Sequence, residues 1–224
     1  SLGAPERSVS FTVPTGNFGD IFAGYIAKRM GLPIEDLVIA TNQNDILHRC
    51  LSTGEYRMDK VLPSYSPSMD IQISSNFERA LFDAYDRDGA AVADLMDGLK
   101  TDNGFSLSQG IIDRLRQYFS QAALSEQETL DCIRETMQNT GEILCPHSAI
   151  GVYVAGRLRN KDVPMITLAT AHPAKFPDAV EKASGTRPAL PERMSNLFQR
   201  DERLSQVSNN LDEITSLIKD RITS

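Results

Sequence analysis

The chain has 224 residues, 41% hydrophobic and 24% charged, a composition that is typical of a globular protein and excludes a disordered or fibrous one. Its 30 acidic and 23 basic side chains give a formal charge of −7, which argues against a general nucleic-acid or anionic-membrane surface. The three cysteines lack metal-finger spacing and no apolar run is long enough to span a membrane, so we expect a cytoplasmic protein without a metal site.

The first part of the chain predicts a strand, a helix and a second strand. Residues 1–7 have the character of a linker, and the β-branched and aromatic residues of 8–13 predict a short strand that ends at the glycine-containing segment 14–19. A helix is expected to follow directly, and 36–41 is then a continuous apolar run of strand length. Such runs are typical of parallel strands covered on both faces, so we expect a right-handed βαβ unit.

The next segment predicts two helices separated by an irregular connection. Apolar residues at helical spacing predict a short helix over 46–51, and the prolines and glycine of 54–73 indicate a loop. Ser75 and Glu78 have the spacing of a capping box, in which the serine hydroxyl accepts from the backbone N–H of Glu78 and the carboxylate reaches back. This box is expected to open a helix over 77–86.

The following hundred residues are predicted to be mostly helical. The pattern over 89–141 is nearly all helical, with a second capping box at 125–128 and Gly141 as a C-terminal cap. Pro146 is expected to begin another helix. The apolar run 163–170 predicts a further strand that ends in a polar turn.

The alternation of strands and helices predicts an α/β domain over residues 8–190. We expect a three-layer open sheet, mainly parallel, with helices on both faces. Residues 191–224 form a charged segment with helical patterns and predict a C-terminal helical extension. Its last helix is amphipathic, which favours a packed arm.

The strongest functional motif is the turn TGNFGD at residues 15–20, between an apolar strand and a helix. Glycines let a backbone turn tightly and approach a ligand closely, so several N–H groups can point at one anion at the helix N-terminus. The spacing is neither a Walker loop nor the dinucleotide GxGxxG. A phosphate group is the natural ligand, and a plain strand-to-helix turn is the alternative.

A second motif, residues 169–176, follows the last predicted strand. Ligands of open α/β sheets bind at the carboxyl ends of the strands, so Thr170 and His172 are candidates to face the same crevice as the glycine turn. As alternatives, Thr170 caps the helix that follows, and His172 only orients the turn around Pro173.

Other polar residues near the predicted strand ends have two interpretations each. Asn42, Asn44 and Asp45 follow a strand and are either ligand contacts or helix caps. Arg79 is the one bidentate donor of its segment and is a candidate to bind a phosphate. His147, at a helix start, is either a polar group of the site or a buried helix histidine.

Five segments resemble one enzyme family. Together they resemble the carboxyl-terminal two-thirds or so of threonine synthase, a pyridoxal-phosphate enzyme of the tryptophan synthase β-subunit fold, or fold type II. The resemblance runs from Val9 to about Pro191 and implies the large domain of that fold. TGNFGD and ATAHPAKF are specific to the family within that fold. In chain order, the segments are VPTGNFGDIFAGYIAKRMGLP, ATNQND, SPSMDIQISSNFERALF, CPHSAIGVYVAGR and TLATAHPAKFPDAVEK.

The resemblance implies a pyridoxal-phosphate-dependent lyase of threonine biosynthesis. Such an enzyme converts O-phospho-L-homoserine and water to L-threonine and phosphate, so O-phospho-L-homoserine is the expected small-molecule substrate. The candidate substrate-binding residues are then Asn42, Asn44, Asp45, Arg79 and His172.

The resemblance also implies which residues meet the cofactor, pyridoxal 5'-phosphate. Thr170 matches the residue at the pyridine nitrogen. For Asp20 we expect the backbone N–H to be the contact, because its carboxylate would repel a phosphate. The residues that match the loop holding the cofactor's phosphate are Gly16, Asn17, Phe18, Gly19 and Asp20.

One element of the family pattern is missing. The Schiff-base lysine lies in a segment resembling GPTxAFKD, and this sequence contains no such segment. We therefore expect a carboxyl-terminal fragment without a catalytic residue of its own, inactive alone, with the amino-terminal half of the enzyme as its missing partner and Ser1 and Leu2 as a cloning remnant. The alternative is a stand-alone, non-catalytic α/β module that binds a phosphorylated metabolite.

Overall fold

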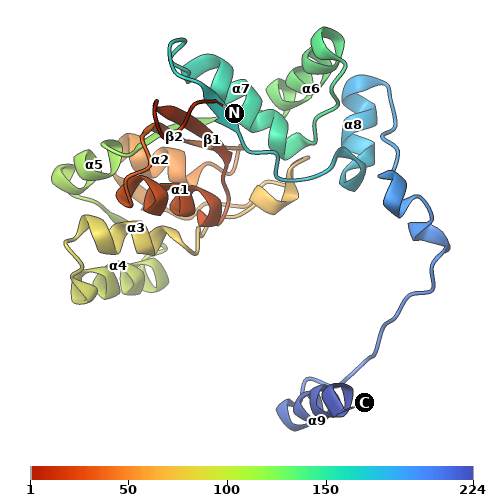
Figure 1. Cartoon of the computed structure of the whole chain (residues 1–224). Coiled ribbons are helices and arrows are strands. Elements are labelled where there is room, and N and C mark those ends of the chain that lie inside the picture. The colour runs from red at the N-terminus through yellow and green to blue at the C-terminus, as the bar shows by residue number, and fades with distance from the viewer. Residues whose placement is uncertain (1, 224) are drawn as a thin grey trace. The chain divides into compact units, whose positions relative to one another are not determined.

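A computed structural model describes residues 2–223 (Figure 1). Ser1, expected to belong to a cloning remnant, and Ser224, the last residue of the predicted extension, lie outside the described residues. The chain forms two compact units, 1–188 and 189–224.

The helices are α1 (Gly19–Arg29), α2 (Ile46–Thr53), α3 (Phe77–Ala84), α4 (Gly89–Thr101), α5 (Gln109–Arg116), α6 (Glu126–Thr140), α7 (Pro146–Leu158), α8 (Pro177–Ser184) and α9 (Leu211–Thr223). The strands are β1 (Val9–Pro14), β2 (Ile34–Thr41), β3 (Glu55–Arg57), β4 (Gly104–Ser106), β5 (Phe119–Ala123) and β6 (Met165–Thr167). The 3-10 helices are η1 (Pro67–Met69), η2 (Pro173–Lys175), η3 (Glu192–Met194) and η4 (Leu197–Gln199).

A four-stranded parallel sheet in the order β5-β2-β1-β6 forms the centre of the first unit. Val13 of β1 pairs with Ile39 of β2, and Thr12 of β1 pairs with Thr167 of β6. The predicted βαβ unit of β1, α1 and β2 is therefore confirmed. All four strands end at one edge, so the segments that follow them gather there.

Helices cover both faces of this sheet, as predicted for a three-layer α/β domain. Leu37 and Ile39 of β2 belong to the core shared with α1, α2, α3 and α5, whereas the alternate residues Val38 and Ala40 pack with α7 on the other face. This alternation follows from the period of two in a strand. Figure 1 shows the sheet between these layers.

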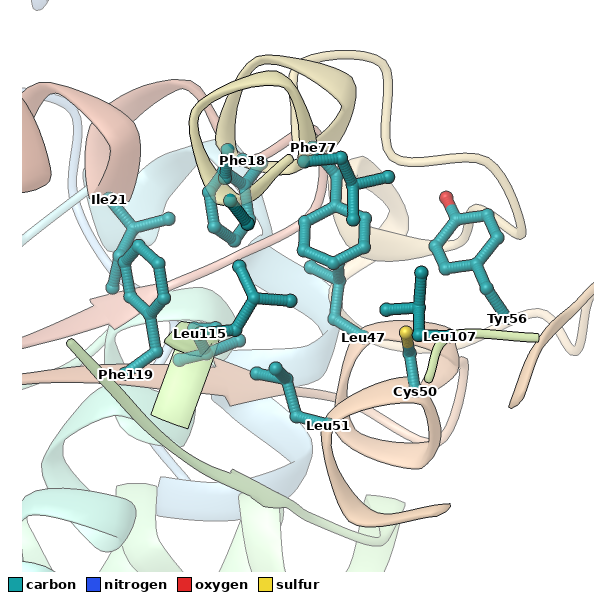
Figure 2. Packing of buried hydrophobic residues seen from close by; sticks show 14 of the residues in the cluster. Phe18, Ile21, Leu47, Cys50, Leu51, Tyr56, Phe77, Leu107, Leu115 and Phe119 are labelled. Atoms are coloured by element: carbon teal, nitrogen blue, oxygen red, sulfur yellow. The ribbon is translucent and has the colours of Figure 1, made fainter. Parts of the chain in front are cut away.

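Aromatic rings fill the larger core (Figure 2). The ring of Phe18 lies edge-on to Phe77 at 5.2 Å and to Phe119 at 5.3 Å between centroids. Tyr56 of β3 stacks on Phe77 at 5.5 Å and on Phe105 at 4.7 Å. Because Phe18 belongs to the glycine turn, the core anchors the turn directly.

The prediction that 89–141 is nearly all helical is wrong at two places. Residues 104–106 form β4, which pairs antiparallel with β3, and residues 119–123 form β5, which pairs with β2. The strand β5, with the sequence FSQAA, lies at the edge of the sheet and is only partly buried beyond Phe119. Its sequence therefore lacks the apolar alternation that predicts a strand. The capping box of Ser125 and Glu128 and the left-handed Gly141 cap of α6 are both confirmed.

Two other local predictions need correction. The capping box of Ser75 and Glu78 does not form: α3 begins at Phe77, Asn76 stands at its N-cap, and no side chain caps it. The Ser75 hydroxyl instead bonds the side-chain oxygen of Asn17 at 3.3 Å. The strand predicted over 163–170 covers only Met165–Thr167, where β6 pairs with β1.

The second unit contains the helix α9, as the apolar spacing predicted. A hollow in this unit is lined by Leu204 and by Leu217, Ile218 and Ile222 of α9. Ile222 nevertheless remains 78% exposed. The apolar face of α9 is therefore only partly covered within this unit.

Candidate functional site

The glycine turn follows β1 at the carboxyl edge of the sheet and leads into α1. Phe18 precedes α1 in a left-handed conformation, with φ at 67°, and its side chain is 1% exposed. An aromatic residue adopts this conformation at a cost, which the burial of its ring in the core offsets. Asn17, Gly19 and Asp20 are exposed around this anchor.

The segment before α3 holds the carbonyl side of the turn. The Ser74 hydroxyl donates to the Gly16 carbonyl at 2.7 Å, and the Asn76 amide nitrogen donates to the Asn17 carbonyl at 2.8 Å. Ser74 is itself fixed, because its N–H donates to the Tyr56 hydroxyl at 2.7 Å. Burial raises the pKa of Tyr56 to about 12, so this phenol stays neutral. The sequence reasoning missed Ser74, and no local pattern in the sequence marks it.

The donor side of the turn is open. Among the described residues, no protein acceptor is recorded for the backbone N–H groups of residues 16–20. The turn lines a hollow of about 220 Å³. These free N–H groups stand at the positive end of the α1 dipole, which favours an anion.

The two glycines of the turn have different roles. A Cβ on Gly16 would lie 2.9 Å from the backbone oxygen of Ser68 in η1, so packing excludes a side chain there. A Cβ on Gly19 would meet only the Asn76 amide nitrogen, at an ordinary 3.8 Å. The protein's own packing therefore does not require glycine at position 19, and its missing side chain leaves the hollow accessible.

Asn42 and Asn44, after β2, form a clamp with Asp70. The Asn42 amide nitrogen donates to Asp70 Oδ1 at 2.8 Å and to the hydroxyls of Ser64 and Ser66, both at 2.9 Å. The Asn44 amide nitrogen donates to Asp70 Oδ1 at 2.9 Å. Both asparagines are almost fully buried. They hold the loop that carries η1, and η1 in turn packs on the glycine turn.

The structure places two further candidates away from the hollow. The carboxylate of Asp45 forms an ion pair with Arg49 of α2 at 2.8 Å and does not cap the helix. The guanidinium of Arg79 lies 6.0 Å from the centre of the Phe22 ring. Arg79 lines a groove of about 600 Å³ along α1, α3 and α4, not the hollow at the turn.

Thr170 and His172 follow β6 at the same edge of the sheet as the glycine turn. Both residues are exposed. The alternative interpretation of Thr170 as a helix cap is wrong, because His172 is the cap of η2: its Nδ1 accepts from the Ala174 N–H at 3.1 Å. Among the described residues, no hydrogen-bond partner is recorded for the Thr170 hydroxyl or for Nε2 of His172.

His147 lies at the second position of α7 and is 5% exposed, so it is buried as expected, and its role as a polar group of the site stays a prediction. Its ring packs on Phe176 at 4.6 Å between centroids, and neither ring nitrogen has a hydrogen-bond partner within residues 2–223. Burial, with a smaller contribution from the nearby charge of Lys175, lowers the pKa of His147 to about 4. At neutral pH the imidazole is therefore uncharged.

No lysine lines the hollow among the described residues. The same part of the chain contains no cluster of three or more His, Cys, Asp or Glu side chains able to hold a metal ion. The cysteines Cys50, Cys132 and Cys145 are free and buried. Within residues 2–223, none of the helices is both long and apolar enough to cross a membrane.

Comparisons with known proteins agree with this architecture. A family model described as "Threonine synthase, C-terminal" matches residues 148–218. The threonine synthase of Pseudomonas aeruginosa is 51% identical over 97% of this chain and 47% of that protein, and that of Saccharomyces cerevisiae is 42% identical over 90% and 44%. A solved structure of PLP-bound threonine synthase from Brucella melitensis matches with a TM-score of 0.92 and 53% identity, over 100% of this chain and 48% of that one.

The parallel sheet and this structural match define an α/β domain of pyridoxal-phosphate fold type II. The chain spans about half the length of the curated relatives it matches, less than the two-thirds expected from the sequence segments. It belongs to the threonine synthase family, as a carboxyl-terminal portion of such an enzyme.

Proposed function

We propose that this chain supplies the cofactor-phosphate half of a threonine synthase site. The whole enzyme would convert O-phospho-L-homoserine and water to L-threonine and phosphate, with pyridoxal 5'-phosphate as cofactor. The observation that carries the proposal is that the backbone N–H groups of residues 16–20 have no recorded acceptor among the described residues, while these same residues line a hollow at the N-terminus of α1. Unpaired donors at the positive end of a helix dipole favour a phosphate group.

Each residue of the turn would contribute to binding the cofactor's phosphate. Gly16, Asn17, Phe18, Gly19 and Asp20 would each offer a backbone N–H, and the Asp20 carboxylate would point away from the anion. The Phe18 ring fixes the turn in the core, so the donors are already in place before the ligand arrives.

At the other end of the ligand, Thr170 would meet the pyridine nitrogen. The bound cofactor supplies an electron sink for the carbanion chemistry of the amino-acid substrate. A hydroxyl at this position, unlike a carboxylate, does not force the ring nitrogen to stay protonated. Thr170 would thereby moderate that sink.

The substrate candidates fall into two groups. We propose that Asn42 and Asn44 act by positioning, because their amides hold the loop with η1 against Gly16. Asp45, Arg79 and His172 stay predicted substrate contacts, of which His172 lies beside Thr170 and has the more favourable place.

We further propose that the reactive lysine comes from the amino-terminal half of the enzyme. The hollow has no lysine in its lining, and the relatives are about twice as long as this chain. On its own the chain would bind phosphate without turnover. We expect the protein to be located in the cytoplasm.

The test is to reassemble the site. The chain is mixed with a separately produced amino-terminal half that contains GPTxAFKD, and phosphate release from O-phospho-L-homoserine is measured with pyridoxal 5'-phosphate present. We expect release from the mixture and none from either part alone. A well-folded mixture of the two halves that stays inactive contradicts the proposal and favours a stand-alone module that binds a phosphorylated metabolite.

A further inference from the structure

The position of His147 links it to the site. Gly151, one helical turn later on the same face of α7, has so little room that a Cβ there would lie 2.7 Å from Thr167 and 3.1 Å from Pro14, at the ends of β6 and β1. A crossover helix runs antiparallel to the strands it connects, so its N-terminus lies at their carboxyl edge. His147 therefore lies where the chain leaves β1 for the glycine turn and β6 for Thr170.

The surroundings of His147 leave its ring nitrogens unused. Both atoms are buried without a partner, although a neutral imidazole has one donor and one acceptor to satisfy. The neighbouring charged groups are Lys175 of η2 and Asp70, after η1. Phe176 covers the ring on one side. Unpaired buried polar atoms cost stability, and a phenylalanine would give the same packing without that cost.

We propose that His147 is a binding residue of the same ligand site, whose neutral imidazole hydrogen-bonds the pyridine-ring part of the ligand while the glycine turn holds the phosphate. This inference rests on the proposed function. Because Phe176 covers the imidazole in the free chain, ligand binding would shift the segment 169–176. None of the residues of that segment belongs to the buried core, so the shift would disturb little packing.

Two ligands separate the two parts of the site. Inorganic phosphate tests the glycine turn alone, and pyridoxine 5'-phosphate adds the ring without an aldehyde that would react with lysines. Calorimetric titration of the chain with each ligand gives the two affinities. Thermal unfolding of the ligand-free chain shows whether each variant folds.

The informative variant is His147→Phe, which keeps a ring against Phe176 and removes both nitrogens. We expect unchanged affinity for phosphate, about 10-fold weaker binding of pyridoxine 5'-phosphate, and an unfolding temperature equal to or above that of the wild type, because two unpaired polar atoms are gone. His147→Gln, which restores a donor and an acceptor, should regain part of the lost affinity. The control Gly19→Ala should weaken the binding of both ligands.

The outcomes separate this inference from the proposed function. If His147→Phe binds pyridoxine 5'-phosphate as the wild type does, or loses stability and both affinities together, His147 is structural and the inference is overturned while the proposed function stands. If the wild-type chain binds neither ligand, the proposed function fails and this inference fails with it.

Discussion

The segments after β1 and β2 leave the same edge of the sheet but differ in whether their polar groups are hydrogen-bonded within the protein. After β1, the backbone N–H groups of residues 16–20 have no recorded protein acceptor. After β2, every side-chain nitrogen and oxygen of Asn42 and Asn44 is hydrogen-bonded within the protein. The segment after β2 supports the turn after β1, because Asn42 and Asn44 hold the loop in which η1 packs against Gly16. The paired side chains of Asn42 and Asn44 thus support a turn whose own donors are unpaired.

The largest expected effect comes from breaking the clamp. Asn42→Ala removes the amide that donates to the Asp70 carboxylate and to the Ser66 hydroxyl in a buried place and leaves Asn44 as the amide partner of Asp70, so we expect a loss of about 3 kcal/mol in the free energy of unfolding. Urea denaturation measures it. Gln43→Ala, which removes one exposed bond to Pro63, is the matched control and should cost less than about 1 kcal/mol. Equal losses in both variants would refute the clamp.

A pH titration extends the comparison to His147, a third polar group at this edge. Its pKa is about 4 in the folded chain and about 6.5 when unfolded, so the unfolded state binds the proton more readily. Stability should therefore fall as the pH drops from about 6.5 towards 4, by up to about 3 kcal/mol. His147→Phe removes this contribution, and the difference between the two proteins is measured by denaturation at each pH. If the free energy of unfolding of both proteins depends on pH in the same way, His147 is not the source of the pH dependence.

Within the turn, a substitution of Gly16 should lower the stability of the fold. Gly16→Ala forces a Cβ to within 2.9 Å of the Ser68 oxygen, and η1 has to shift. Such overpacking should lower the free energy of unfolding by about 2 kcal/mol, again measured with urea. A stability equal to that of the wild type would mean that η1 yields without cost.

The smallest effect on stability, with the opposite sign, is expected at Gly19. Gly19→Ala places its methyl group in ordinary contact and reduces the freedom of the unfolded chain, so the free energy of unfolding should rise by up to about 1 kcal/mol. Because Gly19 lines the hollow, the added methyl group should weaken phosphate binding about 5-fold or more. A calorimetric titration that finds wild-type affinity would move the ligand away from this turn.

Sequence reasoning succeeded where the determining contacts are local. The β1, α1 and β2 unit follows from consecutive apolar runs and a glycine turn, and the box at Ser125 from residues three apart. It failed for β5, whose place in the sheet depends on pairing with β2 and not on its own pattern. The wrongly predicted capping box at Ser75 shows the same limit, because the Ser75 hydroxyl donates instead to the side-chain oxygen of Asn17, 58 positions away.

The site divides in the same way. The glycine turn was found because its residues are contiguous, and its open N–H groups agree with the expected role. The use of Asn42 and Asn44 could not be predicted, because their partner Asp70 lies in an irregular loop that only the folded chain brings to them. Ser74 is of the same kind, since its support of Gly16 is a long-range contact.

The most direct test of the account is a titration followed by amide nitrogen and proton NMR. Pyridoxine 5'-phosphate is added to the nitrogen-15-labelled chain, and the backbone N–H signals of residues 16–20 are compared with the side-chain amide signals of Asn42 and Asn44. We predict that the turn signals shift in a saturable way while the two side-chain amides stay in place, since their partners do not change. A saturable shift confined to other parts of the chain, with the signals of 16–20 unmoved, would contradict the assignment of the phosphate to the glycine turn.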